Sequence, residues 1–431
     1  MNEQDNSRKS YFLGLLTGCI IAAFILCLVL IIKVIVGEGA ATDSRGRMTA
    51  KPTAPQTQTT QDPVQVPAPD GLVAEDQAVL DKMNYIEDLI DKEFIDSVSN
   101  DALQEGIYDG MMSALKDPYA EYYTPEEWIE MQQDTQGIYY GIGAYLTKDE
   151  DTLYPRITGI IKNTPAEETG LQEDDYIVEI EGEDTYNWDL SDVVSHIKGP
   201  EGTKVHLTIS RKENGNRVET EYDVERRRVE TPTVEYEMKE DSIAYIAISE
   251  FDTVTIDQFA EALSDARSDG MKAMVLDLRS NPGGSLQAVV EIARMILPKG
   301  RIVYTEDKYG VQESFDCDGK YELDVPLAVL VNGNSASASE ILSGAIKDYG
   351  LGTLVGTTTF GKGIVQQLFR LTDGSAVKLT VSHYYTPNGN DIHKVGIEPD
   401  VEVEFDADAY REDKTDNQLD KAMEILKKKL P

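Results

Sequence analysis

Hydrophobic positions recur along this chain with two different periods, and these periods divide it into helical and β-rich stretches. From residue 72 to residue 133 apolar side chains recur every three or four positions, first at Val79, Met83, Ile86, Ile90 and Phe94, which predicts helices with one apolar face. Residues 137–228 show short β-rich runs, a glycine-rich turn and one helical pattern. From residue 242 onward, short apolar runs alternate with helical patterns. This alternation predicts an α/β core whose central strands are covered on both faces.

The same patterns predict the individual elements of the C-terminal half. We expect buried strands at 243–248, 273–279 and 327–331, and helices at 257–268, 286–297 and 416–430. Further strand-rich sequence lies between residues 354 and 385. Because this region is irregular, a regular doubly wound sheet is not expected.

A run without charged residues extends from Tyr11 to Ile32. It is long enough to cross a bilayer as a helix, which predicts a transmembrane anchor over residues 11–36. Arg8 and Lys9 precede the run and favour a cytoplasmic N-terminus at residues 1–10, although basic residues also follow it. A cleaved signal peptide is the alternative, and the length of the apolar run favours a retained anchor.

Composition narrows the classes of partner and cofactor. The 431 residues are enough for two to three domains. The 40 basic and 78 acidic residues give a net charge of −38, which argues against nucleic acid as a partner. The 3 cysteines and 4 histidines form neither a disulfide framework nor a metal-ligand spacing. We therefore expect no metal and no cofactor.

The most informative stretch for chemistry is 331–348, which has the sequence V-N-G-N-S-A-S-A-S-E-I-L-S-G-A-I-K-D. A strand, a turn and then Ser337-x-x-Glu340, which resembles a capping box, predict a helix that begins beside a serine. Free backbone N–H groups and the positive end of the helix dipole lie at such a position, and they can hold the negative charge that develops in acyl transfer by a serine. The local pattern does not distinguish Ser337 from Ser335 or Ser339. Serines that only cap the helix are the simpler alternative.

A candidate base lies between Thr359 and Gln366, where Lys362 stands between two glycines in an otherwise apolar run. A buried lysine loses solvation of its charge, so its pKa falls and it can act as a base near neutral pH. An ordinary surface lysine beside turn glycines is the alternative. A histidine base, His383 or His393, also stays open, although no serine–histidine spacing supports it.

Two motifs mark the β-rich stretch, P-A-x-x-x-G-L at 165–171 and D-x-I-x-x-I-x-G at 175–182. With the order of the surrounding elements, they resemble a PDZ domain of the permuted type found in bacterial proteases. In that family the N–H groups of a glycine loop hold the C-terminal carboxylate of a peptide, which adds as a strand. The resemblance therefore implies peptide binding at Gly141, Ile142 and Gly143. A turn in a small β domain that binds nothing is the alternative.

Three further motifs follow in order: D-L-R-x-N-P-G-G at 277–284, N-S-A-S-A-S-E at 334–340 and F-G-K-G-x-V-Q at 360–366. Together they resemble the C-terminal processing (tail-specific) peptidases, whose core is related to the Clp peptidase and crotonase fold, and the resemblance covers roughly residues 75–410. Ser280 stands where that family often has Asn, which we treat as a minor departure. The resemblance implies that Ser337 is the nucleophile, that Lys362 is the base and that Gln366 orients the lysine. It also implies an oxyanion hole of backbone N–H groups from Ala338 and from either Gly283 or Gly284.

These observations predict an α/β multidomain protein with a Clp peptidase/crotonase-like core, an inserted PDZ domain, an N-terminal helical region and a single transmembrane helix. Residues rich in Thr, Gln, Pro and Ala precede the helices and predict a disordered linker. In chain order we expect a cytoplasmic N-terminus (1–10), an anchor (11–36), the linker (37–71), a helical dimerisation region (72–135), the PDZ domain (136–228), the peptidase core (229–408) and a C-terminal helix (409–431).

The predicted function is that of a serine endopeptidase held in the cell membrane by one N-terminal helix, with its catalytic domain outside the cytoplasm. Its expected partners are protein or peptide substrates with accessible C-termini, with a homodimer or higher homo-oligomer as a further hypothesis. The first alternative is a catalytically silent PDZ adaptor that presents peptides to a partner protein, against which the intact Ser337, Lys362 and Gln366 argue. The second is a crotonase-type enzyme acting on thioesters, for which neither a basic face nor a nucleotide motif is present.

Overall fold

The computed structural model describes residues 77–430. The predicted cytoplasmic segment (1–10), the anchor (11–36) and the linker (37–71) lie outside the described residues, so these assignments stay predictions. None of the helices between residues 77 and 430 combines the length and the apolar character that a bilayer crossing requires.

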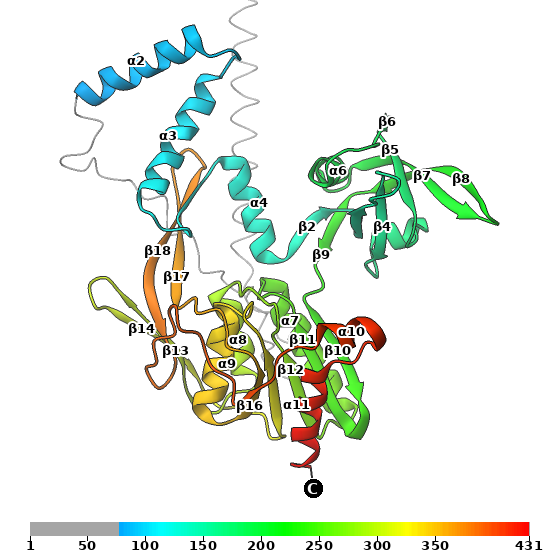
Figure 1. Ribbon diagram of the computed structural model, residues 1–431, viewed down its shortest axis with the longest axis vertical. Helices are drawn as coiled ribbons and strands as arrows, with labels where there is room; N and C mark the ends of the chain where they lie inside the picture. The colour runs from blue at the N-terminus through cyan, green and yellow to red at the C-terminus, as the bar shows by residue number, and fades with distance from the viewer. Residues whose placement is uncertain (1–76, 431) are drawn as a thin grey trace, which may run out of the picture. The chain divides into compact units, whose positions relative to one another are not determined.

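The N-terminal helical region is attached to the C-terminal half through a short strand and through the buried Trp128 of its last helix. It comprises α2 (Gln77–Glu93), α3 (Asn100–Ala114), β1 (Glu121–Tyr123) and α4 (Pro125–Gln136). Helix α4 begins at a capping box: Glu127 N donates to Thr124 Oγ1 and Thr124 N donates to the Glu127 carboxylate. Strand β1 pairs antiparallel with β18 (Ala376–Tyr385) of the C-terminal half (Figure 1). This pairing carries the end of the helical region onto the peptidase half of the chain.

The β-rich stretch forms its own sheet and its own hydrophobic core. Its elements are β2 (Ile138–Gly141), β3 (Ala144–Lys148), β4 (Pro155–Ile160), α5 (Pro165–Thr169), β5 (Tyr176–Ile180), β6 (Glu183–Asp184), α6 (Leu190–Ile197), β7 (Lys204–Glu213), β8 (Asn216–Glu225) and β9 (Arg227–Glu230). The sheet has the order β3-β4-β5-β7-β8, and Ile157, Ile177 and Leu207 lie at its centre with no exposed surface. Strands β2 and β9 pair with each other where the chain enters and leaves this stretch, as expected for an inserted domain.

The C-terminal half is built on a six-stranded sheet. Its strands, in the order in which they pair, are β10 (Val234–Lys239), β11 (Ile243–Ile248), β12 (Ala273–Asp277), β15 (Leu327–Val331), β16 (Gly352–Gly356) and β19 (Val401–Glu402). All neighbours pair in parallel except β10, which is antiparallel to β11. Strands β12 and β15 are buried along their whole length, which explains why they have continuous apolar sequences rather than alternating ones.

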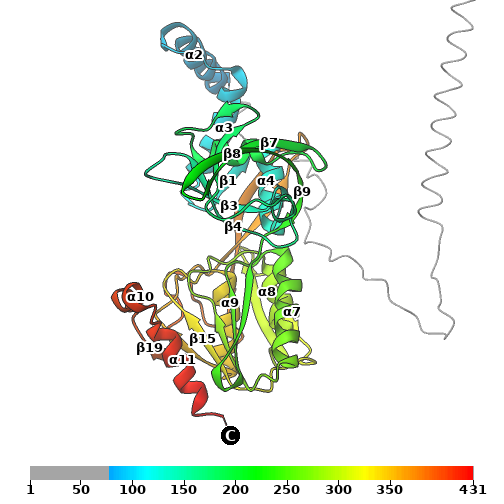
Figure 2. The ribbon, with the colours of Figure 1, turned by 90° about the vertical axis from the view of Figure 1, so that its right-hand side faces the viewer.

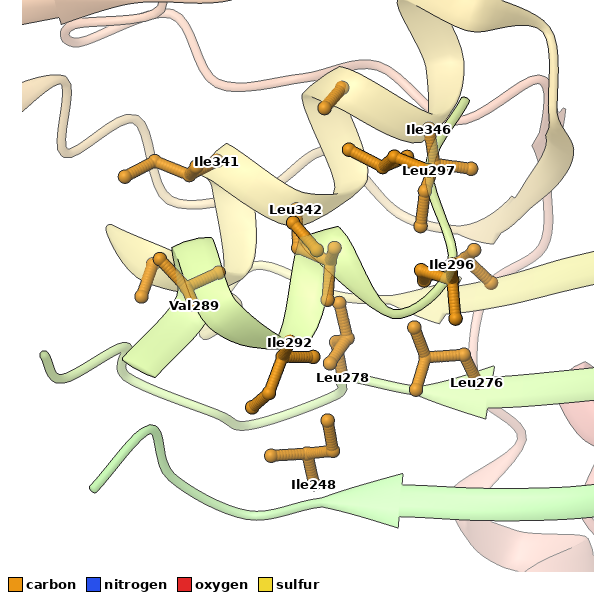
Figure 3. Close-up of a cluster of buried hydrophobic side chains, with 14 of the residues drawn as sticks. Ile248, Leu276, Leu278, Val289, Ile292, Ile296, Leu297, Ile341, Leu342 and Ile346 are labelled. Atoms are coloured by element: carbon orange, nitrogen blue, oxygen red, sulfur yellow. The ribbon is translucent and has the colours of Figure 1, made fainter. Parts of the chain in front are cut away.

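Helices cover this sheet on both faces, as predicted. Helices α7 (Thr253–Ser268), α8 (Leu286–Arg294) and α9 (Ala338–Tyr349) pack on side chains such as Ile248 and Leu276, whereas α11 (Asn417–Lys427) packs on Val275 and Leu330 of the other face (Figure 2). Figure 3 shows Val289 and Ile292 of α8 and Leu342 of α9 gathered with Leu276 and Ile248. Successive residues of a strand point to opposite faces, so both layers share the same strands.

The irregular region expected between residues 354 and 385 forms a second sheet with earlier strands. Strands β13 (Gly300–Asp307), β14 (Gln312–Cys317), β17 (Ile364–Arg370) and β18 form it with β1, in the order β1-β18-β13-β14 and with β17 on β18. The short helices η2 (Glu240–Ser242) and α10 (Ala407–Asp413) complete the described chain. The expectation that the core is not a regular doubly wound sheet is therefore confirmed.

Several element boundaries differ from the predicted ones for local reasons. Helix α7 begins at Thr253 rather than at residue 257, because Thr255 Oγ1 accepts a hydrogen bond from Asp252 N and caps the earlier turn. Strand β12 ends at Asp277 rather than at residue 279, because the Asp277 carboxylate accepts the backbone N–H of Arg279 and turns the chain. The short polar side chains at these ends compete with the regular elements for backbone hydrogen bonds.

Candidate active site

The candidate nucleophile lies in the turn that joins β15 to α9. Because β12 and β15 are parallel neighbours, the loops at their carboxyl ends lie next to each other. The Asn332 side chain joins these loops: its Oδ1 accepts hydrogen bonds from Ser280 N at 2.9 Å and from Asn334 N at 3.0 Å. The D-L-R-x-N-P-G-G motif and the serine-rich motif therefore form one site.

The structure distinguishes the three serines that the local pattern left equivalent. Ser335 and Ser339 are fully buried, and their hydroxyls donate to Leu278 O at 2.8 Å and to Asn281 O at 3.0 Å. Ser337 is partly exposed, and within residues 77–430 its hydroxyl donates no hydrogen bond. Of the three, Ser337 alone offers a hydroxyl that is both accessible and free to give up its proton.

Ser337 has a strained backbone that is held from both sides. Its φ of 53° and ψ of −111° are uncommon for a residue with a side chain. The Ser337 N–H donates to Glu340 Oε2 at 2.9 Å, and the Ser337 carbonyl accepts from the hydroxyl of the buried Tyr384 at 3.0 Å. Strain of this kind persists only where surrounding contacts determine the conformation. Here those contacts fix the direction of the Ser337 side chain.

Two backbone N–H groups in the two joined loops are available to stabilise an oxyanion. Ala338 is the first residue of α9, so its N–H has no partner within the helix, and no other acceptor among the described residues contacts it. Of the two glycines, Gly283 N donates to Asn281 Oδ1 at 2.8 Å, whereas Gly284 N has no hydrogen bond within the described chain. The geometry thus favours Ala338 and Gly284 as donors over Gly283.

Gly283 serves a steric purpose instead. A Cβ atom at this position would lie 2.7 Å from Ser337 Cβ and 3.0 Å from Ala338 N. Its φ of 109° is also a conformation that favours glycine. The glycine therefore allows the two loops to approach each other closely enough to form the site.

The loop that carries Lys362 is attached to the same turn through one carboxylate. Glu340 is fully buried. Its Oε1 accepts from Thr359 Oγ1 at 2.6 Å and from Gly361 N at 2.7 Å, and its Oε2 accepts from Lys362 N at 2.9 Å. The backbone N–H of Ser337 binds that same Oε2 atom. The candidate nucleophile and the candidate base are thus brought together by a shared acceptor.

The Lys362 side chain lies in a partly buried environment that lowers its pKa. Burial is the largest cause and the positive charge of Lys378 adds to it, while Asp117 and Glu340 act in the opposite direction. The ammonium lies 4.4 Å from the centroid of the Tyr119 ring. Within the described residues, no hydrogen bond joins this ammonium to Ser337. The lysine has the electrostatic character of a base and is held over an aromatic ring.

Tyr119 and Lys378 have no counterpart in the sequence-based prediction. Tyr119 lies between α3 and β1. Lys378 lies on β18 and donates to Glu121 Oε2 at 2.5 Å and to Tyr123 Oη at 2.6 Å. Although burial opposes it, these two hydrogen bonds raise the pKa of Lys378, so its charge persists beside Lys362. No local pattern could have indicated either residue, because the pairing of β1 with β18 brings them to the site.

The other candidates for activating the serine make different contacts. Gln366 Nε2 donates to Thr380 Oγ1 at 3.3 Å, and within the described chain it makes no hydrogen bond to Lys362. The rings of His383 and His393 lie 5.5 Å apart, and burial, followed by the charges of His383 and Lys394, lowers the pKa of His393. Neither histidine bonds to Ser337 in the described part of the protein, so the histidine alternative gains no support.

The predicted peptide-binding loop borders a cavity of about 480 Å³. Gly141, Ile142 and Gly143 line it together with α6, and the N–H groups of Ile142 and Gly143 have no acceptor among residues 77–430. Gly143 has a φ of 87°, and a Cβ there would lie 2.3 Å from Thr164 Cβ, so only glycine fits. This loop can therefore donate hydrogen bonds to a carboxylate in the cavity.

Three acidic residues, Asp134, Glu250 and Asp252, also line this cavity. Burial raises the pKa of Asp252 to about 7, and the charges of Glu250 and Asp134 add to the effect. The same desolvation and the charge of Asp134 raise the pKa of Glu250. The charge in this cavity is therefore expected to change near neutral pH.

Three family models match parts of this chain. Residues 242–403 match peptidase family S41, residues 156–211 match the PDZ domain, and residues 42–127 match the activating protease CtpB N-terminal domain. A carboxyl-terminal-processing protease of Synechocystis sp. is 39% identical over 322 residues, which cover 73% of this chain and 75% of that protein. A probable CtpA-like serine protease of Staphylococcus aureus is 36% identical over 338 residues, or 78% of this chain and 66% of that protein.

Among solved structures, a photosystem II D1 C-terminal processing protease is 28% identical, with a TM-score of 0.44 over 74% of this chain and 86% of that one. The resemblance to the C-terminal processing peptidases that the sequence motifs suggested is confirmed by the family match and the curated relatives.

Proposed function

Because the chain belongs to peptidase family S41 and is a C-terminal processing serine protease with a PDZ domain, we propose that Ser337 and Lys362 are its catalytic dyad. Ser337 is the nucleophile and Lys362 the general base. Gln366 orients the lysine once substrate is bound, and Ala338 and Gly284 donate to the oxyanion. The observation that carries this proposal is the accessible Ser337 hydroxyl in a turn that shares the Glu340 carboxylate with the lysine loop.

The proposed reaction begins with a neutral Lys362, which takes the proton of the Ser337 hydroxyl as Oγ attacks the scissile carbonyl carbon. The carbonyl oxygen becomes an oxyanion that accepts hydrogen bonds from Ala338 N and Gly284 N. The protonated lysine then gives its proton to the leaving amine, and an acyl–serine ester remains. Water attacks this ester after losing a proton to Lys362, and Ser337 leaves with a proton restored to its hydroxyl. These reaction steps use no metal and no cofactor.

The PDZ domain recognises the substrate in this proposal. The free N–H groups of Ile142 and Gly143, in the loop that begins at Gly141, bind the C-terminal carboxylate of the tail, and the tail lies along α6 in the adjoining cavity. Binding at this loop also provides a means by which substrate can control the active site.

The remaining parts of the proposal rest on the sequence. The uncharged apolar run within residues 11–36 supports a single-pass anchor in the cell membrane, with the catalytic domain outside the cytoplasm. The amphipathic pattern of the N-terminal helical region supports self-association as a homodimer or higher homo-oligomer.

A cleavage assay with the purified full chain in detergent tests the proposal. The substrate is an unstructured peptide with an apolar C-terminal residue, compared with the same peptide amidated at its C-terminus. We expect Ser337→Ala and Lys362→Ala to abolish cleavage without loss of the folded state. Amidation should raise KM about tenfold or more, because hydrogen bonds to a charged group contribute ~1.5–3 kcal/mol.

The controls separate the parts of this proposal. Substantial cleavage by Ser337→Ala would assign the nucleophile to another residue. A wild-type chain that binds the peptide without cutting it would favour the adaptor alternative. Equal KM values for the free and amidated peptides would remove tail recognition from the PDZ loop while leaving the dyad intact.

A further inference from the structure

Glu340 does more in this structure than a capping residue requires. We propose that Glu340 is a positioning residue for proteolysis, whose carboxylate holds the Ser337 turn and the Lys362 loop at the separation that proton transfer needs. This inference rests on the proposed dyad of Ser337 and Lys362. It adds a third residue that touches neither substrate nor the reacting atoms.

The contacts of the carboxylate lie mostly outside the helix that Glu340 belongs to. A capping box needs one hydrogen bond, from the N–H of the N-cap residue, and Ser337 N supplies it. The other three donors, Thr359 Oγ1, Gly361 N and Lys362 N, all belong to the segment before β17. Three of the four contacts of Glu340 therefore attach a different part of the chain.

The burial of Glu340 makes this attachment strong. A carboxylate with no exposed surface loses its hydration and is stable only when hydrogen bonds replace it. Both of its oxygens accept two hydrogen bonds each, so moving either loop would leave a buried charge partly unsatisfied. Thr359 Oγ1 also accepts from Ile397 N at 2.7 Å, which connects a third segment to the same network.

The Glu340 Oε2 atom connects this network to catalysis, because it binds both Ser337 and Lys362. Oε2 binds the backbone N–H of Ser337 and of Lys362 at 2.9 Å each, so one atom sets the separation of the two residues. The Lys362 ammonium itself contacts the Tyr119 ring rather than a hydrogen-bond acceptor. The backbone of the base is therefore anchored, while within the described residues its ammonium has no hydrogen-bond acceptor.

The charge of Glu340 also acts on the lysine. It raises the pKa of Lys362 against the larger lowering caused by burial. A neutral side chain at position 340 would remove this contribution, so Lys362 would lose its proton at a lower pH. This provides a readout that a purely structural role for Glu340 would not change.

The experiment compares Glu340→Gln and Glu340→Asp in the full chain with Asp416→Asn as a matched control. Asp416 is a largely buried carboxylate of the same half of the protein, where it pairs with Arg279 and caps α11. For each variant the measurements are kcat and KM on the tail peptide, the pH dependence of kcat/KM, the melting temperature, and hydrogen exchange at the amides of Gly361 and Lys362.

For Glu340→Gln we expect kcat to fall about 10²-fold, as misplacement of reacting groups by about 1 Å does, with KM changed less than about threefold. The rise of kcat/KM with pH should move to lower pH, and the two amides should exchange faster. Glu340→Asp keeps the charge and should recover part of kcat and the wild-type pH dependence. Asp416→Asn should lower the melting temperature with kcat within about twofold of wild type.

The outcomes distinguish this inference from the proposed dyad. If Lys362→Ala is inactive but Glu340→Gln keeps wild-type kcat, the positioning role is wrong and the dyad stands. If Lys362→Ala keeps its activity, the dyad itself is wrong. If Glu340→Gln does not fold, Glu340→Asp decides between the outcomes. A folded Glu340→Asp with wild-type kcat and protected amides would support the role of the charge. Fast exchange of both amides in Glu340→Asp without loss of kcat would overturn the inference.

Discussion

The turn that carries Ser337 and the loop that carries Lys362 are built in different ways. The turn is made by two neighbouring parallel strands, and its serine is held by hydrogen bonds at both its N–H and its carbonyl. Lys362 in the loop is held only at its backbone N–H, and its ammonium contacts Tyr119 from the N-terminal helical region. The nucleophile is placed by the core, whereas the environment of the base is assembled from several segments.

This difference indicates where the enzyme can be controlled. Moving Ser337 would disturb the sheet and a buried network, which costs stability. Moving the segment around Tyr119 would change only the solvation and contacts of Lys362, and with them its pKa. We therefore expect changes in the N-terminal helical region to alter the pH dependence of proteolysis more than the geometry of the nucleophile.

The largest expected effect comes from replacing the base by an apolar side chain of similar length. Lys362→Met should reduce kcat about 10²–10⁴-fold, the usual contribution of general base catalysis. The same change should stabilise the protein by ~0.5–2 kcal/mol at neutral pH, because burial opposes the charged lysine. Kinetics and thermal unfolding of one preparation check both effects. A variant that loses activity and stability together would indicate a structural lysine.

The sign of this stability effect follows from the direction of the pKa shift. The pKa of Lys362 is lower in the folded chain than its ordinary value of 10.5, so the unfolded chain binds more protons between those two values. In that window the stability of the wild type rises with pH. The stability difference between Lys362→Met and the wild type should therefore shrink as the pH rises towards 10.5.

A smaller but still large effect is expected from crowding the nucleophile. Gly283→Ala would place a Cβ 2.7 Å from Ser337 Cβ, so the serine has to move and kcat should fall by up to about 10²-fold. Gly270→Ala is the matched control, since Gly270 also has a positive φ but nothing within 4 Å of an added Cβ. Both variants should lose stability, and only Gly283→Ala should lose the rate. Equal kcat values for the two would place Gly283 outside the site.

The smallest effect is expected from the aromatic ring beneath the lysine. Tyr119→Leu removes a cation–π contact, worth ~0.5–2 kcal/mol, that stabilises the charged lysine. The rise of kcat/KM with pH should then move to lower pH by roughly 0.4–1.5 units, whereas Tyr119→Phe should keep the wild-type profile. The pH–rate profiles of the three proteins measure this. A shift in Tyr119→Phe as large as in Tyr119→Leu would assign the effect to the hydroxyl instead.

Much of the fold could be predicted because it depends on local periodicity. The strands at 243–248 and 327–331 have the predicted boundaries, since continuous apolar runs between turn residues identify buried strands. The coverage of the sheet on both faces followed from the same runs. The second sheet could be anticipated only as irregular, because β17 is the neighbour of β18 in sequence whereas its other partners, β1 and β13, are separated from it by long stretches of chain.

The sequence by itself determined the family, the presence of a PDZ domain and the motif in which the nucleophile lies, because these depend on residue types at short spacing. Only the tertiary structure decided that the hydroxyls of Ser335 and Ser339 donate hydrogen bonds to backbone carbonyls. It also decided that Gly283 N donates to a side chain and that Tyr119 lies against Lys362. It also decided that Glu340 joins two loops rather than capping one helix. Those facts depend on which distant segments pack together, and no local pattern contains that information.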